Sequence, residues 1–327
     1  MADPVADSGL EHPDTPVIPP TPATVEPLAD GVYALITGGD PNTGFIVGER
    51  SVLVVDARAT PALARETVAT VRNVTDKPIE FLVLTHYHAV RALGASGIGA
   101  AHIVAHRGTR DLVRERGQAD FESEARRFPR LFLDIDSIPG LTHPDISYAD
   151  AMTLDLGGRE VELRWLGRAH TEGDTAVWLP AERVLFAGDL VEASAAPYCG
   201  DAYILDWPAT LRNVRALGAQ ALVPGRGPAV RGPEVGRAID DTEAYLTTLR
   251  DAVREAVRQE QDVAAAYAAA ESALTPRFGE WAIFRHCLPF NVQRMYDDVA
   301  GVRPRIWTES RDAALWRALV ATGAGQQ

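Results

Sequence analysis

The sequence predicts an α/β fold in which strands and helices alternate through the first two thirds of the chain and a helical extension follows. From residue 31 onward, short apolar runs are separated by Gly, Asp and Asn, which is typical of strands joined by turns. Helix-favouring stretches lie between these runs, and the sequence after residue 234 is mostly helix-like. With 327 residues, of which 46% are hydrophobic and 24% charged, the chain can form a sizeable core.

The first half of the fold is predicted from five apolar runs and the segments between them. Strands are expected at GVYALIT (31–37), GFIVG (44–48), SVLVVDA (51–57), FLVLTH (81–86) and HIVAH (102–106). Residues 61–71 begin with proline and are rich in alanine, so a helix is expected there. A further helix is expected near Ala92, and a long polar helix over residues 109–127.

The second half repeats this alternation. The segment MTLDLGGREVELRWLG (152–167) predicts a hairpin that turns at Gly157 and Gly158, and residues 174–189 predict another pair of strands. A helix over residues 206–217 and a strand at QALVPG (220–225) follow, before the helical remainder. Helices are therefore expected on both outer faces of the sheets.

Charge and composition exclude several classes of partner. A formal net charge of -13 argues against nucleic-acid and anionic-membrane surfaces, and no apolar run approaches the roughly 20 residues that a membrane-spanning helix needs. Residues 1–25 contain six prolines and no Lys or Arg, so they predict a disordered, acidic arm rather than a secretory or transit signal. Cys199 and Cys287 form neither a disulfide framework nor a thiolate cluster, and a cytoplasmic location is expected.

Four potential metal ligands follow predicted strands. His86 and His88 come directly after the strand at 81–86, where the chain can turn both imidazoles toward one point, and His170 and Asp189 lie beside two other strands. Zinc in catalytic sites takes about three protein ligands, usually imidazole and carboxylate, and keeps one position for water. The set therefore predicts a catalytic metal centre.

Five ordered motifs carry a resemblance to a known family. They are the strand ending in Asp56, THYHAVR (85–91), AHTEGDT (169–175), FAGD ending in Asp189, and VPGRG (223–227). In order, spacing and flanking residues, they make residues 28–227 resemble the metallo-β-lactamase superfamily. The resemblance implies an αββα sandwich of two similar halves over residues 26–233, with a helical extension over residues 234–327 packed on it. FNVQRMYDDVAG (290–301) further resembles a subgroup of zinc hydrolases associated with sulfur oxidation or quinoprotein systems.

The chain departs from the family pattern at three positions. The pattern H-x-H-x-D-H would place Asp at 90 and His at 91, and the fifth motif would place His at 226, but the chain has Val90, Arg91 and Arg226. The resemblance implies that the first metal site keeps its ligands, whereas the second loses three. One metal ion per chain is therefore expected, and zinc is the expected metal. The implied ligands are His86, His88, His170 and Asp189.

The two arginines allow two interpretations. They can replace the charge of the second metal ion and bind a carboxylate, sulfate or phosphate of the substrate, or a developing oxyanion. Alternatively, they form buried ion pairs with Asp56 or Asp189. The two interpretations can coexist.

Other residues are expected to support the site. Asp189 is the candidate for orienting the metal-bound water or accepting its proton. The resemblance places Asp56 behind the ligands, where it steadies an imidazole or a loop. Asp174 is expected to hold its own loop, Tyr198 is a candidate substrate contact, and His286 either lines the pocket mouth or packs in the core.

The predicted function is a single-metal hydrolase that cleaves a small ester, lactone, thioester or amide with an anionic group. One alternative is an oxidoreductase of the same fold with a mononuclear non-haem iron, because two His and one Asp can hold iron with open positions. A second alternative is a non-catalytic binding protein with a degenerate metal site. A homodimer is a further expectation.

Overall fold

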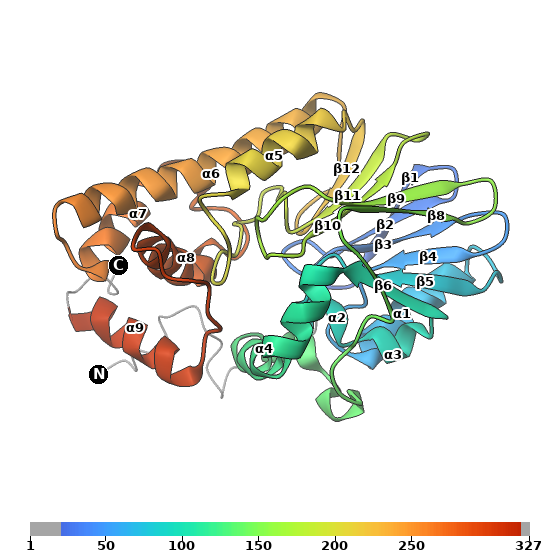
Figure 1. The fold of residues 1–327 in the computed structure, drawn as a ribbon, viewed down its shortest axis with the longest axis horizontal. Helices are drawn as coiled ribbons and strands as arrows, with labels where there is room; N and C mark the ends of the chain where they lie inside the picture. Colours follow the sequence, from blue (N-terminus) through green and yellow to red (C-terminus); the bar gives the residue numbers. More distant parts are fainter. Residues whose placement is uncertain (1–20, 322–327) are drawn as a thin grey trace.

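The computed structural model describes residues 21–321, which form two mixed sheets packed face to face with helices on both outer sides (Figure 1). The first sheet has its strands in chain order: β1 (Thr24–Ala29), β2 (Val32–Ile36), β3 (Thr43–Val47), β4 (Val52–Val55), β5 (Ile79–Val83), β6 (His102–His106) and β7 (Ile146–Tyr148). The second has the order β13-β12-β11-β10-β9-β8: β8 (Ala151–Asp155), β9 (Glu160–Trp165), β10 (Thr175–Leu179), β11 (Val184–Gly188), β12 (Ala221–Pro224) and β13 (Val230–Arg231). The predicted αββα sandwich is confirmed.

The helices lie in the connections and in a C-terminal extension. They are α1 (Pro61–Arg72), α2 (Ala89–Ala92), α3 (Ala95–Ile98), α4 (Arg107–Arg127), α5 (Trp207–Ala216), α6 (Pro233–Arg258), α7 (Val263–Phe278), α8 (Phe284–Val299) and α9 (Glu309–Ala321), with 3₁₀ turns at Pro129–Phe132 and Ile135–Ser137. In Figure 1, α6 to α9 extend to one side of the sandwich. No helix of the described residues is long and apolar enough to cross a membrane.

The alternation of side chains along β4 shows how the layers are held. Leu53 and Val55 point between the two sheets, whereas Val52 and Val54 point to the cluster under α1 and α3. Because strand side chains alternate between faces, one apolar strand contributes to two separate cores. All four side chains are at most 2% exposed, which explains why VLVV is an uninterrupted apolar run.

The two sheets contain the same local unit. In the first sheet β4 and β5 are parallel neighbours joined through α1, and in the second β11 and β12 are parallel neighbours joined through α5. The segments SVLVVDA (51–57) and RVLFAGDL (183–190), each an apolar run that leads into an aspartate, contain β4 and β11. Four of the five motifs lie at or just after the carboxyl ends of these four strands, and the third, AHTEGDT, lies between β9 and β10.

The elements that sequence patterns missed are short or lie at sheet edges. β1, β7 and β13 were not predicted, and the helix expected near Ala92 is two short helices, α2 and α3. β1 begins at Thr24, inside the arm predicted over residues 1–25, and residues 1–20 lie outside the described residues. A strand of two or three residues is too short to show an alternating pattern.

Candidate metal centre

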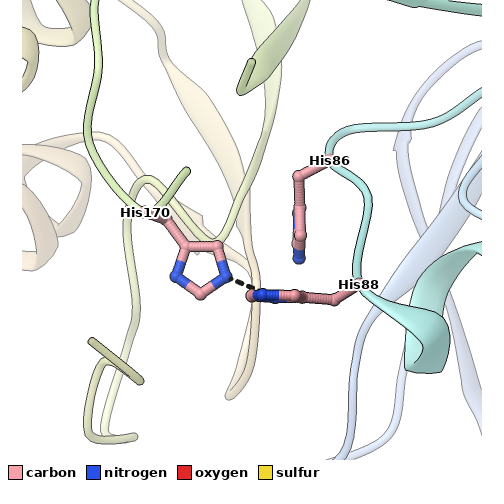
Figure 2. A group of neighbouring side chains, drawn as sticks. All are labelled: His86, His88 and His170. Atoms are coloured by element: carbon pink, nitrogen blue, oxygen red, sulfur yellow. Dashed lines mark hydrogen bonds between the residues drawn. The ribbon is translucent and has the colours of Figure 1, made fainter. Parts of the chain in front are cut away.

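Three histidine rings from both halves of the fold meet at one point (Figure 2). His86 follows β5, His88 is the N-cap of α2, and His170 lies in the loop between β9 and β10. One nitrogen from each ring lies within 4.8 Å of the other two, and the ring centroids are 4.6 to 4.9 Å apart. All three side chains are at most 3% exposed.

Of the three inward-facing nitrogens, one has no hydrogen-bond partner among the described residues and the other two contact each other. Nε2 of His86 is buried without a hydrogen-bond partner among the described residues. Nδ1 of His88 and Nε2 of His170 face each other at 3.0 Å. Buried polar atoms are usually satisfied, so an orphaned nitrogen beside two facing nitrogens fits a site built for a metal ion.

The outward-facing nitrogens are each held by a neighbour. Nδ1 of His86 lies 3.0 Å from Oγ1 of Thr85, and Nδ1 of His170 lies 2.9 Å from the carbonyl oxygen of Tyr198. Nε2 of His88 lies 3.1 Å from Oδ1 of Asp201. Such contacts fix the tautomer and orientation of a ligating imidazole, so each ring presents its other nitrogen to the centre.

The protonation of the three rings differs with their surroundings. Burial lowers the pKa of His86 well below its usual value and lowers that of His170 to about 3, so both rings are neutral and able to bind a metal ion. Burial also lowers the pKa of His88, but the carboxylates of Asp201 and Asp120 outweigh it and raise the value to about 10. In the metal-free protein His88 is therefore an imidazolium, and a metal ion has to displace the proton on Nδ1.

A cluster of ion pairs lies directly beside the histidines. Nη1 of Arg91 donates to Oδ2 of Asp56 at 3.0 Å, and Nη2 donates to Oδ1 of Asp189. Nη1 of Arg226 donates to Oδ2 of Asp189 at 2.8 Å and to Oε1 of Glu192 at 3.2 Å. The structure thus contains the buried ion pairs that were one of the two interpretations of these arginines.

Asp189 links the arginines to the histidines. Its Oδ2 lies 3.5 Å from Nε2 of His170 and 3.9 Å from Nε2 of His86, at the edge of the three-histidine group. Burial raises the pKa of Asp189, but the guanidinium groups of Arg91 and Arg226 outweigh it and hold the value well below the usual range. Asp189 is therefore a carboxylate whose two oxygens are each occupied by a guanidinium.

The VPGRG segment fits this cluster because of Gly225. The carbonyl oxygen of Gly225 accepts a hydrogen bond of 2.8 Å from Nη2 of Arg91. A Cβ atom at this position would overlap Oδ1 of Asp189, so only glycine allows the backbone to approach this closely.

Asp56 supports His86 through Thr85. Its oxygens accept hydrogen bonds of 2.8 Å from the backbone N–H and from Oγ1 of Thr85, whose hydroxyl lies beside His86. Asp56 has a φ of 61°, which costs a non-glycine residue about 1–3 kcal/mol and commonly marks a functional site. Burial raises the pKa of Asp56 to about 6, although Arg91 opposes this effect.

The other predicted residues lie around the centre in different roles. Asp174 accepts hydrogen bonds from the backbone N–H and Oγ1 of Thr171, so it holds the loop that carries His170. The ring centroid of Tyr198 lies 6.0 Å from that of His88. His286, in α8, packs against Phe128 with ring centroids 4.3 Å apart.

Sequence reasoning missed several polar residues of the centre. Oδ2 of Asp201 accepts a hydrogen bond from the Tyr87 hydroxyl while its Oδ1 contacts His88. From α4, Asp120 and Glu124 accept the backbone N–H groups of Ala89 and Val90 at 2.8 and 2.9 Å, which satisfies the first turn of α2. The segment GDAY (200–203), which contains Asp201, and the polar face of α4 match no known local motif. These residues are therefore identified only from the folded structure.

The fold and site together define an αββα protein with a candidate metal site, and comparisons with known proteins identify its family. The sequence model of the metallo-beta-lactamase superfamily matches residues 36–265, so the chain belongs to this superfamily. It is 27% identical over 220 residues to a metallo-beta-lactamase type 2 of Bacteroides fragilis, covering 62% of this chain and 79% of that protein. A protein with the same name from Bacillus cereus is 26% identical over 195 residues, covering 57% of this chain and 67% of that one.

Two further comparisons show the range of this similarity. The chain is 26% identical over 216 residues to the 2,4-dinitroanisole O-demethylase subunit alpha of a Nocardioides species, covering 62% of this chain and 57% of that protein. The solved structure of a metallo-beta-lactamase from Pontibacter korlensis matches with a TM-score of 0.56 at 20% identity, covering 69% of this chain and 99% of that one. At this identity the structural match establishes the fold alone.

Proposed function

We propose that this protein is a hydrolase that uses a single metal ion, zinc, to cleave a small ester, lactone, thioester or amide. The observation that carries the proposal is the arrangement of His86, His88 and His170, with inward nitrogens converging and outward nitrogens held. A site with three imidazole ligands and room for water is typical of catalytic zinc. When bound, the metal ion would polarise a carbonyl and lower the pKa of its bound water to about 7.

Asp189 is proposed to orient the attacking water rather than to remove its proton. Its Oδ2 faces the histidines at 3.5 and 3.9 Å, which is the right region for accepting a hydrogen bond from water at the centre. However, two guanidinium groups hold its pKa well below the usual range, and a weakly basic carboxylate is a poor general base. Orientation needs only a fixed acceptor, and the ion pairs fix it.

Arg91 and Arg226 are proposed to replace the second metal ion as fixed positive charge. Both guanidinium groups are buried and contact Asp189, and guanidinium groups keep their charge at all accessible pH values. Val90, at the position of the family's aspartate, offers no ligand. We therefore expect one metal ion per chain.

The stoichiometry is tested by restoring the family ligands. In the variant Val90→Asp/Arg91→His/Arg226→His, the purified, zinc-saturated protein is expected to bind two zinc ions per chain instead of one, by elemental analysis after desalting. The natural chain binding two ions, or a folded variant still binding one, would refute the idea that side chains fill the second position.

The reaction class is tested with zinc-loaded protein and a panel of 4-nitrophenyl esters, thioesters and lactones. We expect turnover that is lost on zinc removal by a chelator and restored by zinc. Stoichiometric iron after purification without added metal would refute the proposal that the metal is zinc, and it would favour the oxidoreductase alternative. Absence of any tightly bound metal, together with no effect of His88→Ala, would favour a binding protein.

A further inference from the structure

A third buried arginine lies near the centre, and its surroundings differ from those of Arg91 and Arg226. Arg127, the last residue of α4, is 3% exposed. Its guanidinium carbon lies over three aromatic rings: Tyr198 at 4.9 Å, Phe290 at 5.2 Å and Phe128 at 5.5 Å. Aromatic faces attract a cation but leave the edge of the planar guanidinium, with its N–H donors, without acceptors.

The N–H donors of Arg127 are largely unused. Nε donates to Oγ of Ser123 at 3.3 Å, and within residues 21–321 the buried Nη1 has no hydrogen-bond partner. No carboxylate of the described residues lies within 4.0 Å of this guanidinium. A buried cation with an unfilled donor is costly for a fold unless another molecule supplies the acceptor.

Each acidic side chain around Arg127 has one oxygen bound to another donor. Asp120 and Glu124, from the same helix, accept the backbone N–H groups at the start of α2. Asp312, from α9, pairs with Arg126. One oxygen of each of these three groups therefore serves Ala89, Val90 or Arg126, whereas the buried Oδ1 of Asp312 has no hydrogen-bond partner among the described residues. Because none of the three lies within ion-pair distance of Arg127, they do not fill its donors.

Tyr198 connects Arg127 to the metal centre. The ring over which Arg127 lies is 6.0 Å from the ring of His88 and 6.3 Å from that of His170, measured between centroids. The backbone oxygen of Tyr198 also holds Nδ1 of His170. Arg127 and the two histidines therefore share Tyr198 as a neighbour.

We propose that Arg127 binds a carboxylate group of the substrate while the bond to be cleaved lies at the histidines. A carboxylate matches the fork of N–H donors that a planar guanidinium presents. Arg91 and Arg226 do not serve this purpose because Asp56, Asp189 and Glu192 already occupy them. The proposal rests on the proposed hydrolase function for the reaction, and it adds the substrate class: a small carboxylic acid that also carries an ester, thioester, lactone or amide.

The specificity test compares two esters with the same leaving group. The zinc-loaded full chain is assayed with the mono-4-nitrophenyl ester of glutaric acid, which carries a carboxylate, and with 4-nitrophenyl butyrate, which is neutral. The specificity ratio is kcat/KM for the glutarate ester divided by kcat/KM for the butyrate. In Arg127→Met this ratio is expected to fall about tenfold to a hundredfold, which is the effect of losing a charged hydrogen bond. Arg127→Lys, which keeps the charge without the fork, is expected to show an intermediate ratio.

Arg126→Met is the matched control. Arg126 is the neighbouring residue on the same helix, and it pairs with Asp312 of α9. Its removal perturbs the packing of α9 on α4 but leaves Arg127 in place. The ratio for the two esters should be the same as in the natural chain, and an equal fall in both variants would overturn the proposal.

A second measurement separates the carboxylate site from the chemistry. Calorimetric titration of glutarate into the zinc-loaded protein is expected to show binding that is at least tenfold weaker in Arg127→Met. If neither ester is hydrolysed but glutarate binding depends on Arg127, the carboxylate site stands and the hydrolase function fails. Absence of glutarate binding to the natural chain, or equal binding to the variant, overturns the site even where ester hydrolysis is observed. If Arg127→Met does not fold, the same comparison is made with Arg127→Lys, where equal affinity counts against the proposal.

Discussion

The two halves of the centre solve the problem of buried polar groups in opposite ways. In the histidine half, each ring has one nitrogen held by a neighbour and one facing inward, and Nε2 of His86 has no partner in the described chain. In the arginine half, two guanidinium groups pair with three carboxyl groups. The difference indicates that the first half is built to receive an ion, whereas the second supplies its own charges.

Removal of one inward-facing ring should break the first half most completely. His88→Ala deletes one of the three imidazole ligands, so the purified protein is expected to lose stoichiometric zinc, as measured by elemental analysis and by competition with a chromogenic chelator. His102→Ala, at a half-exposed histidine outside the centre, should keep its zinc. Retention of zinc by His88→Ala would remove the main support for the metal centre.

Deletion of one cation should break the second half without removing metal ligands. Arg91→Met leaves Asp56 with only its hydrogen bonds from Thr85 and leaves Asp189 paired with Arg226 alone, and breaking a buried ion pair in this way typically costs about 3–5 kcal/mol. The free energy of unfolding in urea measures the effect on the metal-free protein. Arg231→Met, which removes an exposed pair with Glu26, should cost less than about 1 kcal/mol. Equal costs would show that burial of the arginine pairs is energetically unimportant.

The contact behind His88 sharpens the comparison. Asp201→Asn keeps the size of the side chain but removes the charge that fixes the imidazole of His88. The affinity for zinc is expected to fall about 10- to 100-fold, which is the typical effect of losing such a contact behind a ligand. Zinc affinity is measured by competition with a chelator. Asp111→Asn, at an exposed site on α4, is the control and should leave the affinity unchanged. Unchanged affinity in Asp201→Asn would show that His88 is oriented by packing alone.

The smallest expected effect concerns the loop that carries His170. Burial raises the pKa of Asp174 to about 7 in the folded protein, above its ordinary value of 3.8. Between these values unfolding releases a proton, so this residue's contribution to stability falls as the pH rises toward 7. In Asp174→Asn, the fall in unfolding free energy of the metal-free protein from pH 5 to pH 8 should be smaller, by on the order of 2 kcal/mol. Identical pH profiles would exclude a raised pKa at this position.

Sequence patterns predicted the parts of this protein that depend on local chemistry. Short apolar runs predicted most of the strands, and the order of five motifs, through the family resemblance, predicted that His86, His88 and His170 share one centre. For Arg91 and Arg226, the sequence left two interpretations open, namely binding of an anionic substrate group and buried ion pairs. Arg91 and Asp189 are 98 residues apart in sequence, and His88 and Asp201 are 113 apart. Which charges meet is decided by how the two sheets pack, and no local pattern encodes that.

Arg127 illustrates the same limit from another side. Arginine is the common basic residue of this chain, because lysine occurs only at Lys77, so an arginine at the end of a polar helix attracts no notice in the sequence. Its role emerges only when α4, α8 and the loop after β11 bring Phe128, Phe290 and Tyr198 around it. A functional residue without a motif is found by asking which buried donors lack acceptors.

The origin of the three histidines has a consequence for how the protein folds. His86 and His88 belong to the first sheet and its connections, whereas His170, 82 residues beyond His88, belongs to the second. An ion held by all three would tie the two halves together and stabilise only chains in which both sheets have docked. Zinc would then bind only after the two halves have packed together, so it would lower the unfolding rate more than it raises the folding rate.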